Sequence, residues 1–468
     1  MRYLALILAA LATAEVQASE LAPRLVVSIT VDQLRSDYLE AFSNLYSSNG
    51  FRRVIDNGIV YDGSYPFVPV DRSSAVASVS SGTTPFYNGI IGNKWLDRKT
   101  LRPTSCIDDD KYTYSPSRLK VSTVGDELKI NSHGQSLVYS IAPTKEEAIL
   151  SAGHAADGAF WIDNDGQWQT STYYSKSLPR WVKDYNSEYQ HQSAKRKFYQ
   201  VNDNVVDMTL ALLESTYIGK DDVSDLLNIT LTATLSDNKP SDNSQRNMAG
   251  VYQGLDYSLG RIITAIEKNI GLDKTLVVVT STGYTDEAPE DLSRYRIPTG
   301  TFYIDRSVSL LNMYLGAIYG QGHYVEQCYG NELYFNHRLI EQKRLSMSEI
   351  LGRSQEFLLQ LSGVADVYTS ERLLAGNNDI QKIRAGYNPA VSGDIIIKVT
   401  PGWQLLNETT QQTYTSRASV VLFPIIFFGD GIHHEKVSSP VTVDRIAPTI
   451  TKTIRIRAPN ACEALPLF

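Results

Sequence analysis

The side chains that commonly hold metals or perform acid–base chemistry are widely scattered in this sequence. It has seven histidines and three cysteines among 468 residues. His433 and His434 are adjacent, which is a poor spacing for two ligands of one metal ion, and the other five histidines stand apart. The cysteines, Cys106, Cys328 and Cys462, are also widely spaced, and their odd number leaves at least one unpaired within the chain. These residue types and spacings predict no transition-metal centre.

The elements that must position any site are an alternation of strands and helices. Short apolar, β-branched runs predict buried strands, and helix-compatible stretches such as 248–269 lie between several of them. This alternation predicts an α/β fold with a central, mostly parallel sheet and helices on both faces. The predicted strands are 24–31, 136–141, 229–234, 275–280 and 420–428.

Polar residues follow or precede these predicted elements at a few places. Asp32 comes directly after the first strand, where an aspartate can cap the helix expected over 33–46. A second helix is expected over 50–57, and Gly58 follows it as a C-terminal stop. A run of small residues over 73–81 predicts a helix packed closely on the sheet, with its N-terminus near Arg72 or Ser73.

Composition and the chain ends limit the functional classes. The net charge is -7, which argues against a nucleic-acid partner because a phosphate backbone is held by a basic surface. Residues 1–18 have the positive start, short apolar stretch and small residues of a signal peptide, so we expect a periplasmic or secreted protein. No later apolar run has membrane-spanning length. We expect one domain over 19–468, with a Tyr- and Trp-rich cap insertion at about 99–200 and a second irregular stretch over 371–412.

Eight passages, in order along the chain, resemble one known family. They resemble the secreted bacterial phosphate-irrepressible alkaline phosphatases, which form part of the type I phosphodiesterase and nucleotide pyrophosphatase branch of the alkaline phosphatase superfamily. The resemblance runs from about residue 24 to about residue 456 and implies an alkaline-phosphatase-like fold. The passages are VVSITVDQLRSDYL (26–39), GFRRVIDNG (50–58), SSGTTPFYNGIIGNKW (80–95), SAGHAADGAFWID (151–163), STYYSKSLPRWVKDYN (171–186), IPTGTFYID (297–305), PIIFFGDGI (424–432) and VTVDRIAPTI (441–450).

The resemblance implies a particular chemistry. In the family, a Thr or Ser at a helix N-terminus accepts a phosphoryl group while two zinc ions, held by Asp and His, stabilise the reacting oxygens. Asp32 matches the first metal ligand, but Arg72 stands at the nucleophile position. Arginine cannot accept a phosphoryl group because its guanidinium stays protonated at neutral pH. The remaining metal-ligand positions hold Leu235, Lys239, Thr282, Gly283 and Thr413.

Two further positions bear on phosphate binding. Asn93 matches the family asparagine that touches a phosphoryl oxygen, whereas Glu146 stands about where the family has arginine, next to a surviving Lys145. We therefore predict an inactive, pseudophosphatase relative that binds or scaffolds in the cell envelope, with no catalytic residue, no cofactor and a vestigial metal ligand at Asp32. Arg72 and Asn93 are the candidate residues for holding an anionic or phosphate-containing ligand. In the competing interpretation, Arg72 pairs with Asp71, Asp32 or Glu146 and has a structural role.

Two alternatives remain open at this point. The first is an active hydrolase with a rebuilt site, in which Asp32, Asp237 and Asp242 hold a hard metal such as Mg or Ca and Ser73 or Ser74 is the nucleophile. Zinc is the cofactor that the resemblance implies for an active enzyme. The second is an envelope interaction or glycan-binding protein that uses the aromatic-rich cap as its contact surface.

Overall fold

A computed structural model describes most of the chain. The described residues are 22–193, 201–234, 244–285, 298–376, 378–415 and 421–468. The predicted signal peptide, 1–18, lies outside them, as do Leu235, Asp237, Lys239 and Asp242.

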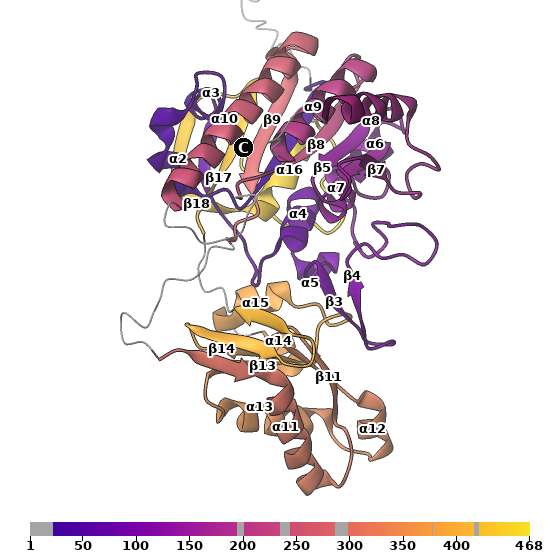
Figure 1. Cartoon of the computed structure of the whole chain (residues 1–468), viewed down its shortest axis with the longest axis vertical. Helices are drawn as coiled ribbons and strands as arrows, with labels where there is room; N and C mark the ends of the chain where they lie inside the picture. Colours follow the sequence, from indigo (N-terminus) through magenta and orange to yellow (C-terminus); the bar gives the residue numbers. More distant parts are fainter. Residues whose placement is uncertain (1–21, 194–200, 235–243, 286–297, 377, 416–420) are drawn as a thin grey trace, which may run out of the picture.

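A nine-stranded sheet forms the centre of the larger part of the molecule (Figure 1). Its pairings are parallel except at β17, which is antiparallel to both neighbours, and at β7, which is antiparallel to β6. The expected mostly parallel sheet is thus confirmed. In order across the sheet, the strands are β18 (Glu435–Thr442), β2 (Ile59–Ser64), β17 (Phe423–Gly429), β9 (Thr275–Ser281), β1 (Leu25–Asp32), β8 (Asp225–Thr232), β5 (Val138–Ala142), β6 (Gly158–Ile162) and β7 (Trp168–Thr170).

Helices cover both faces of this sheet, because side chains of each central strand alternate between two cores. In β1, Leu25, Val27 and Ile29 enter one core while Val26 enters the other. The first core is closed by α2 (Ser36–Ala41), α3 (Phe51–Asn57), α8 (Arg180–Ser193), α9 (Val201–Ser215) and α10 (Ser244–Asn269). The opposite face carries α4 (Arg72–Ser81), α6 (Val124–Asn131) and α16 (Ile446–Thr453), and α7 (Lys145–Ala152) packs beside α4.

The segment after β1 differs from the single helix expected over 33–46. Gln33 has a φ of 61°, in the left-handed region, so the chain turns before a helix can begin. The short helix α2 starts only at Ser36, and a 3-10 helix over Ser43–Leu45 follows it. Asp32 does not cap α2, since the N-cap residue is Arg35 and no side chain caps that end.

The helix α4 matches its prediction and is buried along nearly its whole length. Asp71 is its N-cap residue and forms a capping box with Ser74. Small side chains let α4 lie close to the sheet and to α7. Gly82 ends the helix with a φ of 67°, where a Cβ atom would lie 2.8 Å from the sulfur of Cys462.

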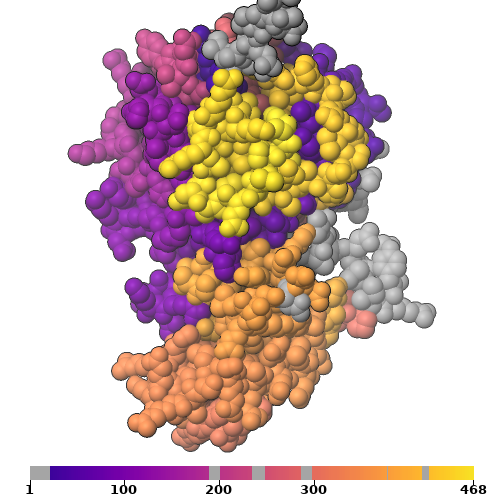
Figure 2. Space-filling model, turned by 180° about the vertical axis from the view of Figure 1, so that it is seen from behind, coloured from indigo at the N-terminus to yellow at the C-terminus, as the bar shows by residue number. Residues whose placement is uncertain are grey.

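A second, smaller unit follows β9 and has its own core. Helices α11 (Ile304–Tyr319) and α13 (Met347–Leu359) pack on a four-stranded antiparallel sheet of β11 (Val325–Tyr329), β12 (Glu332–Phe335), β14 (Ile395–Val399) and β13 (Val364–Thr369). Figures 1 and 2 show this unit, in orange tones, at one end of the molecule. Its other elements are β10 (Gly300–Tyr303), α12 (His337–Gln342), α14 (Ser370–Ala375), α15 (Gln381–Gly386), β15 (Trp403–Asn407) and β16 (Gln412–Thr415).

The cap insertion expected at about 99–200 does not coincide with this second unit. Much of that stretch, namely β5, β6, β7, α6 and α7, belongs to the large sheet and its helices. The expected second irregular stretch, 371–412, lies within the smaller unit, whose extent is not predicted by the sequence. Next to the site described below, α5 (Pro85–Asn88) and the hairpin of β3 (Lys94–Asp97) and β4 (Arg102–Ser105) project toward that unit (Figure 1).

The three cysteines are free, and none forms a disulfide. Over the parts of the chain that the structure describes, no helix combines the length and apolar character required to cross a membrane.

Candidate functional site

Four polar side chains meet at the carboxyl edge of the central strands. Asp32 is the last residue of β1, and Thr282 directly follows the neighbouring strand β9. Arg72 is the first residue of α4, and Glu147 lies in the first turn of α7. In open α/β sheets this edge is where ligands commonly bind, so this cluster is the candidate site.

The cluster is held together by short polar contacts. Arg72 Nη2 lies 2.6 Å from Asp32 Oδ2, and Arg72 Nε donates to the same oxygen at 3.1 Å. Arg72 Nε also lies 3.3 Å from Glu147 Oε1. The Thr282 hydroxyl donates to Asp32 Oδ1 at 2.9 Å. Both oxygens of Asp32 are therefore bound by other side chains of the protein.

Burial decides the charge state of this cluster. The side chains of Asp32 and Glu147 are each 1% exposed, and that of Arg72 is 35% exposed. Burial raises the pKa of Glu147 to about 7, although the attraction of Arg72 opposes that rise. Burial lowers the pKa of Arg72, but the charges of Glu147 and Asp32 outweigh it and raise that pKa overall. Arg72 thus remains a cation facing two buried carboxyl groups.

The N-terminus of α4 is occupied by a carboxylate of the chain itself. Asp71 Oδ1 accepts a hydrogen bond from the Ser74 backbone amide at 2.9 Å, and Asp71 Oδ2 accepts one from the Asn93 backbone amide at 2.6 Å. Free amides at such a helix end would favour an external anion. In this chain Asp71 supplies the anion at that place, so it does not pair with Arg72 as one interpretation proposed.

The two serines after Arg72 are poorly placed to act as nucleophiles. Ser73 is 1% exposed and donates to the Asn93 side-chain oxygen at 3.4 Å; Ser74 is fully buried and caps α4. The neighbouring thiol, Cys106, lies 3.6 Å from the Ser73 hydroxyl, and burial raises the pKa of Cys106 to about 12. The Ser73 hydroxyl donates to an amide oxygen and the Ser74 hydroxyl to the Asp71 backbone carbonyl, so neither is hydrogen-bonded to a base that could remove its proton.

The residues predicted from the sequence are only partly brought together. Arg72, Asp32 and Thr282 meet as described, and exposed Asn93 joins them through its contacts to Ser73 and Asp71. Thr413 lies instead in β16 of the smaller unit, where it pairs with Leu406.

Glu147 is the residue of the site that sequence reasoning missed. Glu146 was expected to face the phosphate position, but Glu147 contacts Arg72. Thr144 is the N-cap residue of α7, and its hydroxyl donates to Glu147 Oε2 at 2.7 Å. The spacing Thr-x-x-Glu is a capping-box pattern, and it was the available signal that the second of the two glutamates turns inward. Lys145 points elsewhere and donates to the Tyr114 hydroxyl at 3.0 Å.

Comparison with known proteins decides the family. The chain matches the family described as type I phosphodiesterase / nucleotide pyrophosphatase over residues 26–419. The chain belongs to this family. Among its relatives are alkaline phosphatase PafA of Elizabethkingia meningoseptica, 24% identical over 95% of this chain and 94% of the relative, and alkaline phosphatase PhoV of Synechococcus elongatus, 25% identical over 94% and 91%.

The fold agrees with that membership. The crystal structure of wild-type alkaline phosphatase PafA superposes with a TM-score of 0.82 at 23% identity, covering 95% of this chain and 98% of that one. The expected alkaline-phosphatase-like α/β fold is confirmed. The relatives are alkaline phosphatases by name, and the resemblance described above implies zinc in their sites.

The residues around Asp32 do not fit a zinc ion. Asp32 Oδ2 accepts two hydrogen bonds from Arg72, which use both of its lone pairs, and Asp32 Oδ1 accepts one from Thr282. The guanidinium also places a positive charge beside the oxygen that a cation would need. Among the described residues, no group of three or more His, Cys, Asp or Glu side chains is placed to hold a metal ion. The passages 235–243 and 416–420 lie outside those residues.

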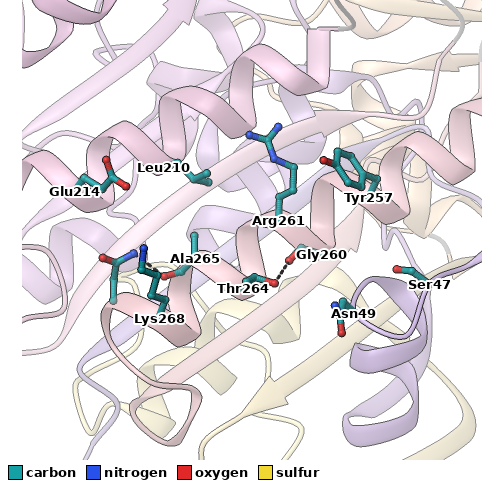
Figure 3. Close-up of a pocket in the computed structure, with 11 residues that line it drawn as sticks. Ser47, Asn49, Leu210, Glu214, Tyr257, Gly260, Arg261, Thr264, Ala265 and Lys268 are labelled. Atoms are coloured by element: carbon teal, nitrogen blue, oxygen red, sulfur yellow. Dashed lines mark hydrogen bonds between the residues drawn. The ribbon is translucent and has the colours of Figure 1, made fainter.

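A cavity of about 510 Å³ lies away from this cluster, between α9, α10 and the loop at 47–49 (Figure 3). Its walls include Leu210, Tyr257, Arg261 and Lys268, and none of its lining residues belongs to the Arg72 cluster. It is a groove on the helical surface, remote from the strand ends where the family site is expected.

Proposed function

We propose that this chain is an exported member of the type I phosphodiesterase family that does not hydrolyse phosphoesters and instead binds or scaffolds in the cell envelope. The observation that carries the proposal is the position of Arg72. It is the first residue of α4, where the family nucleophile is expected, and it is paired with Asp32 and Glu147.

The physical argument has two parts. Phosphoryl transfer in this family needs an oxygen nucleophile and cations that stabilise the charge on the phosphoryl group. Arg72 supplies no nucleophilic oxygen, and its positive charge is neutralised by two carboxyl groups of the protein. Meanwhile Asp71 accepts hydrogen bonds from the Ser74 amide of α4 and from the Asn93 backbone amide, which would otherwise be available to an anion. Side chains of the protein thus occupy both the place of the cations, through Arg72, and the place of the anion, through Asp71.

The export half of the proposal is supported by the sequence of residues 1–18, which lie outside the described residues. It is tested by fractionating cells that express the full chain and sequencing the N-terminus of the mature protein.

A phosphate-containing ligand held without cleavage is a second candidate for the same site. The partial exposure of Arg72 and the exposure of Asn93 favour it, because both could reach a ligand at the surface. The existing contacts of Arg72 with Asp32 and Glu147 favour the structural role instead.

The aromatic-rich stretch at 99–200 gives weaker support to a glycan-binding role. Its rings pack largely on one another: Tyr112 lies 5.1 Å from Tyr173, and Tyr114 lies 6.0 Å from Trp161, between ring centroids. Side chains that stack internally in this way are not presented as an open aromatic platform.

One preparation tests the proposal. We expect the purified protein, loaded with zinc and dialysed, to retain less than one zinc per chain and to cleave neither phosphomonoester nor phosphodiester chromogenic substrates above the buffer rate. Two tightly bound zinc ions together with robust phosphoester hydrolysis would contradict the proposal. Titration of the same preparation with inorganic phosphate separates the candidates, since heat of binding that disappears in Asn93→Ala would favour the ligand role.

A further inference from the structure

We propose that the Arg72 guanidinium is a built-in cation that takes the place of a bound metal, and that removing it exposes a divalent-cation site formed by Asp32 and Glu147. The inference concerns the same site as the proposed function. Its test measures folding stability and metal binding rather than hydrolysis, so the two proposals can fail separately.

The first support is the burial of two carboxyl groups that share one cation. Asp32 ends β1 and Glu147 begins α7, and each is 1% exposed. Over the described residues, Arg72 is the one cation within ion-pair distance of either group. A buried carboxylate without a partner is strongly unfavourable, so the fold needs a positive charge at this place.

The second support is the geometry around a single atom. Arg72 Nε lies 3.1 Å from Asp32 Oδ2 and 3.3 Å from Glu147 Oε1. Oxygen ligands surround Mg²⁺ or Ca²⁺ at about 2.0–2.6 Å, so the two carboxylates would each move inward by roughly 1 Å to share one ion. The Thr282 hydroxyl donates to the other oxygen, Asp32 Oδ1, at 2.9 Å and fixes the orientation of that carboxylate.

The third support is access. The Arg72 side chain is 35% exposed, so truncating it to alanine opens a path from solvent to the carboxylates. Water can then fill the remaining coordination positions of a hard cation. A site made only of oxygen atoms favours Mg²⁺, Ca²⁺ or Mn²⁺ over ions that prefer nitrogen and sulfur.

The experiment compares thermal unfolding of three variants with and without millimolar Mg²⁺ or Mn²⁺. We expect the melting temperature of Arg72→Ala to fall by roughly 5 °C or more in chelator, and most of that loss to be recovered with metal, whereas the unmodified protein does not respond. The double variant Arg72→Ala with Glu147→Gln should be more stable in chelator than Arg72→Ala and insensitive to metal.

A matched control is available on another surface. Arg261 also bridges two carboxylates, Asp207 at 2.5 Å and Asp203 at 4.0 Å, but those groups are 25% and 34% exposed. Arg261→Ala should therefore lose little stability and gain nothing specific from the metal.

Three outcomes would overturn the inference: Arg72→Ala as stable as the parent protein in chelator, a metal response equal in all variants, or no metal binding to Arg72→Ala by calorimetry. If Arg72→Ala does not fold, its refolding yield with and without metal and the stability of the double variant carry the test. A double variant that also fails to fold would contradict the electrostatic argument.

Discussion

At the scale of single residues, the arginine at the start of α4 supplies a positive charge to two buried carboxyl groups of the same chain. The resemblance implies a metal at the aspartate that ends β1, whereas in this chain Arg72 Nη2 lies 2.6 Å from Asp32 Oδ2. Buried charges persist only where they are paired and hydrogen-bonded, and Thr282, Thr144 and Glu147 complete the pairing. In the proposed interpretation, Arg72 supplies the positive charge that a metal would otherwise bring to these carboxyl groups.

A second buried pair gives a prediction about pH. Both ring nitrogens of His154 face acceptors: Nδ1 lies 3.0 Å from Asp126 Oδ2, and Nε2 lies 3.0 Å from the Leu119 carbonyl. The hydrogen bond with Asp126 raises the pKa of His154 above its usual value of about 6.5, because the doubly protonated ring can donate to both partners.

The sign of the effect follows from that direction. A raised pKa in the folded state stabilises the fold fully below about pH 6.5, and this contribution is lost as the pH rises through the folded-state value. We therefore expect the difference in free energy of unfolding between the parent and His154→Gln to be larger at pH 6 than at pH 9, measured by urea denaturation. His133→Gln, at a histidine outside this pair, is the control. A difference that does not change with pH would contradict the assignment.

At the scale of elements, helix ends place the site. The N-termini of α4 and α7 meet at the carboxyl edge of β1 and β9, so residues in their first turns converge. Small side chains in α4 permit this approach, since every residue of that helix after Arg72 is buried.

The cap of α4 gives the prediction at this scale. Asp71→Ala removes the acceptor of the Ser74 and Asn93 amides, so we expect a loss of about 1–2 kcal/mol in the free energy of unfolding. Asp71→Asn keeps an acceptor for Ser74 and should lose less. The measurement is urea denaturation of the three proteins. Equal losses in both variants would show that the carboxylate charge, and not the cap, is what matters.

At the scale of the whole molecule, the hairpin of β3 and β4 joins the large sheet to the smaller unit. Arg98, in the turn of that hairpin, donates to both oxygens of Asp394 at 3.2 Å and also contacts the Ser392 carbonyl. His337 lies 3.0 Å from Asp394, and the Phe335 amide donates to the same carboxylate at 2.8 Å. Asn388 also donates to the Phe86 carbonyl at 2.9 Å, which adds a second contact between the units.

Breaking this contact should loosen the smaller unit. Arg98→Ala leaves Asp394, which is 7% exposed, without its arginine partner, so we expect a loss of about 1–3 kcal/mol and faster amide exchange in β12. Arg98→Lys keeps the positive charge but not the two-point contact with Asp394. We therefore expect its stability to lie between that of the parent protein and that of Arg98→Ala. The readout is hydrogen–deuterium exchange of Phe335 and its neighbours. Unchanged protection there in Arg98→Ala would mean that this contact does not hold the units together.

The sequence by itself determined the central strands, the helices α4 and α10 and the family, and it predicts that Arg72 stands at the nucleophile position. These features depend on local patterns of apolar residues, on helix caps and on motifs in a fixed order, all of which can be recognised without knowing any tertiary contact. The partners of Arg72 were decided only by the tertiary structure. Asp32 and Glu147 lie 40 and 75 positions away along the chain, and the choice of Glu147 over Glu146 depends on which glutamate of the first turn of α7 faces α4. The smaller unit likewise became visible only through its own buried core, because its strands pair across long stretches of sequence.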